Sequence, residues 1–347
     1  MAYTNINKGS DYFNTKLYTG TGSTQSITGV GFQPDFVWCK DRTNSYDHVL
    51  FDAVRGATKR IVSNTTGAET TASTDLTSFD SDGFTVGSGS NINNNGNNFA
   101  SWNWKANGQG SANTDGSINT TYTSVNTTSG FSISTYTGTG SAATIGHGLG
   151  VVPAVVLVKR LNATEHWVMY HHKSNATPQD YYLRLNDLTA VADFPMWNDT
   201  APTNQVFSVG TNDAVNASGS TYVAYCFAEK QGYSKFGSYF GNGNADGTFA
   251  YTGFKPAFIL IKSVSTTNWN MFDNKRSPFN VADETLWANS TDSESTVGTS
   301  YGIDILSNGF KARTVSSQVN NSNTVHIFMA FAEASIVGTN NIAANAR

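Results

Sequence analysis

The chain has 347 residues, of which 13% are charged and 38% hydrophobic, and 21 Lys+Arg against 25 Asp+Glu give a formal net charge of −4. This length predicts two or three domains at roughly 150 residues each, and the absence of any basic run excludes the electrostatic footprint of a nucleic-acid-binding protein. Gly, Ser, Thr and Asn fill the polar positions, which disfavours helices and predicts an all-β chain.

Residues 1–14 lack the basic and apolar regions of a secretory signal, so we expect synthesis in the cytoplasm without a signal peptide, followed by retention there or by export along another route. They precede the repeats described next. We interpret them as an N-terminal docking arm that orders on a neighbouring protein. No stretch of the chain reaches the roughly 18 consecutive apolar residues of a membrane span, so no membrane insertion is expected.

From residue 15 onward the same landmarks recur three times in one order. The first landmark is a Tyr-Thr-Gly-Thr-Gly motif or a looser version of it, at Tyr18–Gly22, Tyr136–Gly140 and Tyr239–Gly243. The second is a turn with a proline and an apolar strand that ends in lysine, at Gly31–Lys40, Gly150–Lys159 and Gly253–Lys262. Each repeat closes with an aromatic strand, at Phe99–Trp104, Tyr222–Glu229 and Ile327–Glu333. A period of this kind marks a repeat architecture.

The repeat predicts three tandem β-sandwich domains of jelly-roll-like type, each from a unit of a little over 100 residues with six to eight short strands. Their expected boundaries are an arm at 1–14, repeat 1 at 15–108, a Gly/Ser/Asn/Thr linker at 109–129, repeat 2 at 130–231, repeat 3 at 232–334 and a C-terminal tail at 335–347. We expect repeats 2 and 3 to pack closely and repeat 1 to be attached less rigidly. The tail is a second candidate docking segment.

The motifs do not predict catalysis. The glycine motif lacks the lysine and the following helix of a phosphate-binding loop, so we interpret it as a turn. His171 and His172 are adjacent on an expected strand and would point to opposite faces. Cys39 and Cys226 lie far apart inside apolar runs, which favours free thiols over a disulfide or a metal site. We therefore expect no enzyme activity, no catalytic residues, no metal and no cofactor.

Aromatic side chains in loops are the better candidates for binding, because aromatic faces stack on sugar rings while Asn and Asp bind hydroxyl groups. The candidate glycan-binding residues are Trp197, Asn198, Asp199, Trp287 and Asn289. The alternative is that both tryptophans cap the ends of their sandwiches.

A lysine recurs at the exit of the same strand in every repeat, at Lys40, Lys159 and Lys262. We expect its stem to stack on a neighbouring ring, or its ammonium to pair with Glu229 and Glu333 in the second and third repeats. Its presence in all three repeats favours a role in the fold.

Several of these segments resemble a repeat domain found in virion proteins of tailed bacteriophages, notably phages of marine bacteria and cyanobacteria. The segments that carry the resemblance are Tyr136–Gly140, Gly146–Gly150, Tyr222–Glu229, Phe236–Tyr239, Tyr251–Phe258 and Phe328–Glu333. The first repeat departs from the pattern at Lys105-Ala106, where the others have Ala-Glu, and in its asparagine-rich turn Asn91–Asn98.

The resemblance implies a structural protein of the virion, most simply a tail or fibre-type appendage component that is exposed on the particle and contacts host-surface glycan. A capsid decoration or head-fibre protein and a polysaccharide depolymerase are the alternatives. The implied partners are other virion proteins, bound through the two terminal arms, and a homo-oligomer on the particle is compatible with the resemblance.

Overall fold

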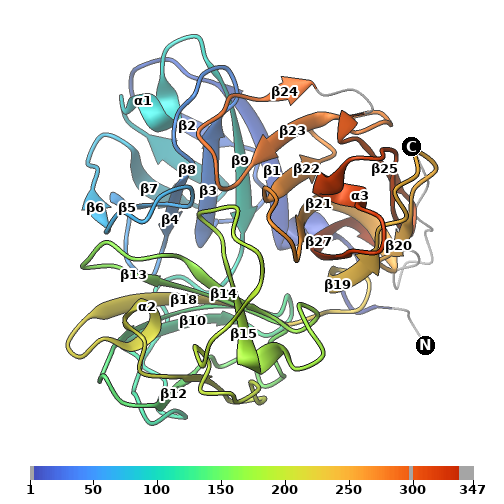
Figure 1. Cartoon of the computed structure of the whole chain (residues 1–347). Coiled ribbons are helices and arrows are strands. Elements are labelled where there is room, and N and C mark those ends of the chain that lie inside the picture. The colour runs from blue at the N-terminus through green and yellow to red at the C-terminus, as the bar shows by residue number, and fades with distance from the viewer. Residues whose placement is uncertain (1–3, 297–299, 336–347) are drawn as a thin grey trace.

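The computed structural model describes residues 4–296 and 300–335, and its regular structure is almost entirely antiparallel β-strand (Figure 1). The strands divide along the chain into what we call the first, second and third parts. The first part has β1 (Phe13–Thr19), β2 (Gln25–Thr28), β3 (Phe36–Asp41), β4 (Val49–Asp52), β5 (Lys59–Val62), β6 (Thr70–Thr71), β7 (Leu76–Asp80), β8 (Gly83–Val86) and β9 (Asn98–Trp104). The second part has β10 (Tyr122–Asn126), β11 (Phe131–Thr137), β12 (Ala143–Gly146), β13 (Val155–Arg160), β14 (Val168–His171), β15 (Tyr181–Arg184), β16 (Ala192–Asp193), β17 (Val206–Val209) and β18 (Thr221–Phe227).

The third part has β19 (Ser234–Phe240), β20 (Phe249–Tyr251), β21 (Phe254–Ser263), β22 (Asn270–Asp273), β23 (Glu284–Trp287), β24 (Ser295–Thr296), β25 (Ile303–Leu306), β26 (Gly309–Ala312) and β27 (Val325–Ser335). The helices are short: η1 (Gly9–Asp11), α1 (Ser90–Asn93), η2 (Pro178–Asp180), α2 (Asp213–Asn216) and α3 (Ser317–Asn320). The predicted all-β class is confirmed.

Each part has one large sheet with the same strand order. That order is β1-β9-β3-β4-β5-β6 in the first part, β11-β18-β13-β14-β15-β16 in the second, and β19-β27-β21-β22-β23-β24 in the third. The second part adds β10 outside β11. Each part also has a small sheet, formed by β2-β8-β7, β12-β17 and β20-β26-β25 respectively. Matching positions in these sheets can therefore be compared directly.

Strand β3 illustrates why the predicted lysine-terminated strands are apolar at successive positions. All its residues are buried. Side chains of a strand alternate between the two faces of the sheet: Val37 and Cys39 pack in a cluster with residues of the small sheet, whereas Phe36 and Trp38 belong to a second cluster on the other face. Both faces are covered, so Phe36, Val37, Trp38 and Cys39 are apolar in succession, and charged residues appear only at the end of the strand, at Lys40 and Asp41.

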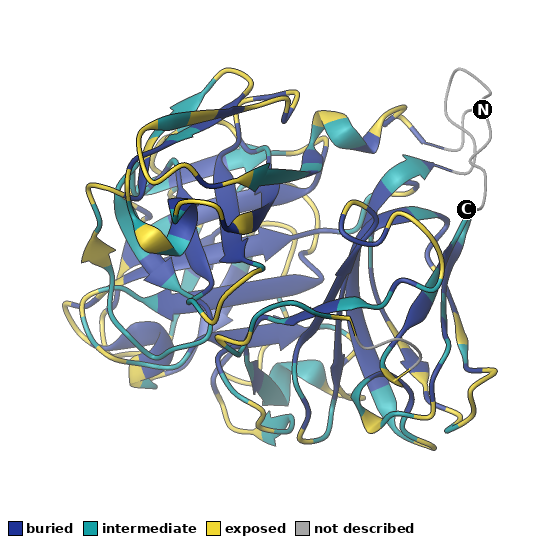
Figure 2. Ribbon diagram, turned by 90° about the horizontal axis from the view of Figure 1, so that it is seen from above, coloured by how far each residue is buried: buried dark blue, intermediate teal, exposed yellow. Residues whose placement is uncertain are grey.

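The inner faces of the three large sheets share one hydrophobic core. At its centre, Trp104, Phe227 and Phe331 occupy matching positions on β9, β18 and β27, and their ring centroids lie 5.5–6.5 Å apart. Figure 2 shows the buried strands gathered in the interior and the exposed residues mainly in peripheral loops. The expectation that the first part is less rigidly attached is wrong, because its aromatic residues pack directly against both other parts.

Two of the predicted boundaries also differ from the structure. The expected arm at 1–14 is not free over its described residues: Thr4 and Ile6 are buried and β1 begins at Phe13. The expected linker at 109–129 contains β10, and Ile118 forms a bridge to Ile145 of β12. The composition of these segments did not predict the contacts, because their Ser, Thr and Asn residues are typical of a linker but here bond to backbone groups of neighbouring strands. Within the expected tail at 335–347, residues 336–347 lie outside the described residues.

The Tyr-Thr-Gly-Thr-Gly motif forms a turn, as predicted. Its last glycine has a positive φ in each part, 69° at Gly22, 75° at Gly140 and 64° at Gly243, where a side chain would be strained. No helix of the described residues is long and apolar enough to cross a membrane.

Candidate functional site

The first predicted glycan site does not present its aromatic ring. Trp197 is only 2% exposed, donates from Nε1 to the carbonyl oxygen of Tyr181 at 3.0 Å, and contacts Tyr170 edge-on. Asn198 and Asp199 are exposed in the following turn. A ring buried in this way cannot stack on a sugar, so the prediction for Trp197 is wrong and the capping alternative describes it.

The second predicted site is also tied into the fold. Trp287 is half-buried on β23 and donates from Nε1 to Asn270 Oδ1 at 3.0 Å. Asn289 Oδ1 accepts the main-chain N–H of Trp269 at 2.8 Å. Asn186 and Asn64 make the same bond, to Trp167 at 2.9 Å and to His48 at 2.8 Å. A contact found in all three parts positions the start of a strand, so Asn289 has a structural role.

The lysines predicted to stack or to pair with glutamates do neither. Lys40, Lys159 and Lys262 are fully buried, and each Nζ donates to main-chain carbonyl oxygens at 2.7–3.3 Å. The two glutamates instead pair with Lys235 and Lys255. Burial lowers the pKa of each of the three lysines to about 8.

One carbonyl in each lysine cage comes from a neighbouring part. Lys40 donates to Thr291 of the third part, Lys159 to Thr66 of the first, and Lys262 to Leu188 of the second. These bonds lead around the three parts in one direction and return to the start. The recurring lysine therefore joins each large sheet to the next, which sequence reasoning missed because the acceptors are backbone atoms.

Main-chain hydrogen bonds follow the same cycle. The N–H of Glu69 donates to Leu161 at 2.8 Å, that of Val191 to Val264 at 2.9 Å, and that of Glu294 to Arg42 at 2.9 Å. We call the contacts that these bonds mark the first–second, second–third and third–first interfaces.

The three interfaces differ in the residue at the last position of β4, β14 and β22. Asp52 accepts a hydrogen bond from Tyr225 Oη at 2.7 Å, and Asp273 accepts one from Trp102 Nε1 at 3.1 Å. His171 stands at the matching position of the second part, where its Nε2 lies 3.2 Å from the carbonyl oxygen of Phe328.

The residue facing each of these positions explains the difference. Met329 matches Trp102 and Tyr225 in the strand register and has no hydrogen to donate. An aspartate opposite it would be a buried charge without that donor. Burial, with a contribution from His172, lowers the pKa of His171 to about 3, so its ring is neutral and suits this interface.

The metal-ligating and thiol side chains of the described residues form no further site. They include no group of three or more His, Cys, Asp or Glu side chains placed to hold a metal ion. Cys39 and Cys226 are free and buried, and burial raises the pKa of both thiols, that of Cys39 to about 12.

The third part exposes three aromatic side chains on β20 and at the end of β19. Phe240, Phe249 and Tyr251 are 67%, 42% and 55% exposed, and we call this surface the β20 face. In the strand register, Phe240 matches Thr19 of the first part and Phe249 matches Ser26. Comparison of the repeats position by position would have found this surface from the sequence.

A family model described as "Domain of unknown function (DUF7483)" matches residues 8–335, so one model spans all three parts. No curated protein matches the chain.

Proposed function

We propose that this chain, which belongs to the DUF7483 family of domains of unknown function, is a non-enzymatic structural protein of a tailed-bacteriophage particle. Its place would be a tail or fibre-type appendage exposed on the virion. The sequence resemblance to virion repeat domains, carried by segments such as Tyr222–Glu229 and Phe328–Glu333, supports this assignment.

We further propose that the three parts are tandem copies of one β-sandwich module, arranged as a ring with approximate threefold symmetry. The closed cycle of lysine and main-chain hydrogen bonds is the observation that carries this proposal. A head-to-tail interface that closes after three copies is the geometry of a cyclic trimer, here within one chain.

A ring of this kind suits a structural component. Its centre is filled by aromatic and aliphatic side chains from all three sheets, so each part buries apolar surface that it would expose alone. Appendages of tailed phages are commonly built on threefold or sixfold axes, and a module with threefold character fits such an axis. Contact with host-surface glycan would have to use residues other than Trp197.

Mass spectrometry of purified virions of the phage that encodes the chain tests the assignment, with immunogold labelling to locate it. We expect the chain in the particle with label on the tail. Label on the head would favour a decoration protein instead, and absence from purified virions would refute a structural role. Incubation of the purified chain with host envelope glycan should release no reducing sugar; release would support the depolymerase alternative.

A further inference from the structure

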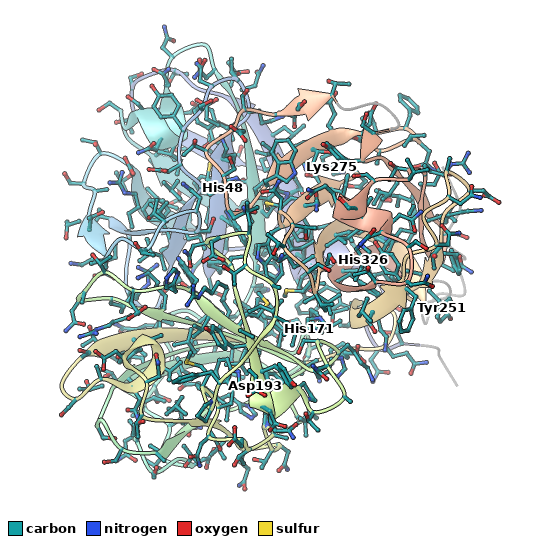
Figure 3. All side chains as sticks on the ribbon, viewed as in Figure 1. His48, His171, Asp193, Tyr251, Lys275 and His326 are labelled. Atoms are coloured by element: carbon teal, nitrogen blue, oxygen red, sulfur yellow. The ribbon has the colours of Figure 1, made fainter. Side chains whose placement is uncertain are left out.

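The β20 face lies on a strand with an open edge. Strand β20 is the last strand of its sheet and pairs only with β26 among the strands of the described residues. Figure 3 places Tyr251 at the outer margin of the third part, far from His171 near the middle of the molecule. Unpaired edges are sites where another strand can add, and proteins usually blunt them with polar or charged residues.

The first part follows that rule at the matching edge. Its strand β2 presents the exposed side chains of Ser26 and Thr28. The third part has Phe249 and Tyr251 at these positions, so the edge carries apolar rings instead. The two edges therefore have the same backbone geometry and opposite surface chemistry.

In the second part, an extended segment already occupies the matching edge. Ile118 forms a parallel bridge to Ile145 of β12, and its N–H donates to the carbonyl oxygen of Thr144 at 3.0 Å. Ser117 adds two bonds to Thr144, each of 2.9 Å, and the Ile118 side chain is buried in the core of the second part.

The backbone N–H and C=O groups of β20 that do not bond to β26 point toward the open edge, as those of Thr144 do in the second part. Ala312 donates to the carbonyl oxygen of Thr248, and the N–H of Thr252 donates to Asn308, so even-numbered residues bond toward β26. Because successive residues of a strand alternate in this respect, the N–H and C=O of Phe249 face the open edge. In the strand register, Phe249 is the counterpart of Thr144.

We propose that the open edge of β20 binds an extended peptide segment of a partner protein by β-strand addition. The segment runs parallel to β20, is low in charge, and places a β-branched or aliphatic side chain where Ile118 lies in the second part. Main-chain bonds to Phe249 supply affinity, and the rings of Phe240 and Tyr251 cover the added strand. A glycan would leave the strand's amide and carbonyl groups without this pairing. The proposal does not depend on the chain being a virion protein.

A peptide-display library selected on the purified full-length chain tests this inference. The blocking variant is Phe249→Pro, which removes the outward N–H but no bond to β26. Ser26→Pro makes the matched change at the edge of the first part. Tyr251→Thr installs the residue type that the first part has at Thr28, and it removes a ring without altering the backbone. It tests the same edge independently, in case the proline variant does not fold correctly.

We expect selected peptides with a β-branched or aliphatic residue, bound at least tenfold more weakly by Phe249→Pro and Tyr251→Thr and equally well by Ser26→Pro. Hydrogen exchange should show new protection at residues 249–251 when a peptide binds. Selection of no peptide, or peptides that bind all variants equally, would overturn the proposal.

Two further outcomes would assign the edge to another occupant and overturn the proposal. In the first, residues 249–251 are protected from hydrogen exchange in the free chain and lose this protection when residues 336–347 are deleted. That result would show that the chain covers its own edge. The other is a dimer in sedimentation velocity that Phe249→Pro dissociates, which would identify a second copy as the occupant.

Discussion

The buried charge of Arg276 at the third–first interface offers the most direct test of the energetics. Its guanidinium is fully buried and bonds to Asp273, to Glu294 and to two main-chain carbonyl oxygens. It also lies 5.5 Å from the ring centroid of Trp102 of the first part. Replacement by methionine keeps most of the side-chain volume but removes the charge, so Asp273 is left buried without its cation. Breaking one partner of a buried ion pair costs about 3–5 kcal/mol, which is the loss we expect in the free energy of unfolding of Arg276→Met.

The second part provides the control. Ser174 stands three residues after His171, as Arg276 does after Asp273, and its hydroxyl has no hydrogen-bond partner within residues 4–296 and 300–335. Ser174→Ala should therefore change stability by less than about 0.5 kcal/mol. Urea unfolding followed by tryptophan fluorescence measures both variants. A loss below about 1 kcal/mol in Arg276→Met, or an equal loss in Ser174→Ala, would refute the reasoning.

The pH dependence separates the lost ion pair from lost packing. Burial alone would raise the pKa of Asp273, but Arg276 and the hydrogen bonds lower it overall. The native protein therefore gains stability from Asp273 above its unfolded pKa of about 3.9, and loses it as pH falls through the lower folded pKa. Without Arg276, burial raises this pKa, so the variant is penalised as pH rises above about 4. The deficit of Arg276→Met should be larger at pH 7 than at pH 4, whereas a packing defect would be equal at both.

Three other predictions concern buried residues: a recurring lysine, a recurring asparagine and Cys39. Burial lowers the pKa of Lys262 to about 8, against about 10.4 in an unfolded chain. Between these two pH values the unfolded state binds more protons than the folded state, so the free energy of unfolding should rise from pH 8 toward 10. Urea unfolding at pH 7.5, 8.5 and 9.5 should show a flatter rise in Lys262→Met, and an unchanged rise would contradict the lowered pKa of Lys262. Asn186→Ala and Asn289→Ala remove equivalent hydrogen bonds to a main-chain N–H and should each cost about 1–2 kcal/mol in chemical unfolding. A loss confined to one of them would argue against equivalent roles. Cys39 is buried and its pKa is raised to about 12, so a thiol reagent should modify it only after denaturation; rapid labelling of the folded chain would be inconsistent with the structure.

The sequence predicted the strands better than the way in which the parts associate. Three features are local and recur in each part of the sequence: the lysine-terminated strands, the turn glycines and the closing aromatic strands. The partners of the closing strands are not local: Trp104 and Phe331 lie more than 200 residues apart in the chain, and their rings meet only in the core that the three large sheets share.

The predicted site failed for a related reason. Trp197 is followed by the polar residues Asn198, Asp199 and Thr200, which is typical of an exposed loop, yet its ring packs against Tyr170. Only the fold reveals that cover. By contrast, the exposed ring of Phe249 stands at a position where the first part has Ser26, a difference that a comparison of repeats can detect.

The three interfaces are not equally supported by the chain itself. Residues 105–121 join the first part to the second and residues 228–233 join the second to the third, whereas the third and first parts are not consecutive along the described residues. At that unlinked interface Arg42 reaches across to the carboxylate of Glu294, which also bonds to Arg276. The first–second interface has Leu161 in the place of Arg42. A linked interface is held at high effective concentration by its tether, whereas an unlinked one must be specified by its own contacts. The additional arginine therefore stands at the interface where a charge pair contributes most to choosing the correct partner surface.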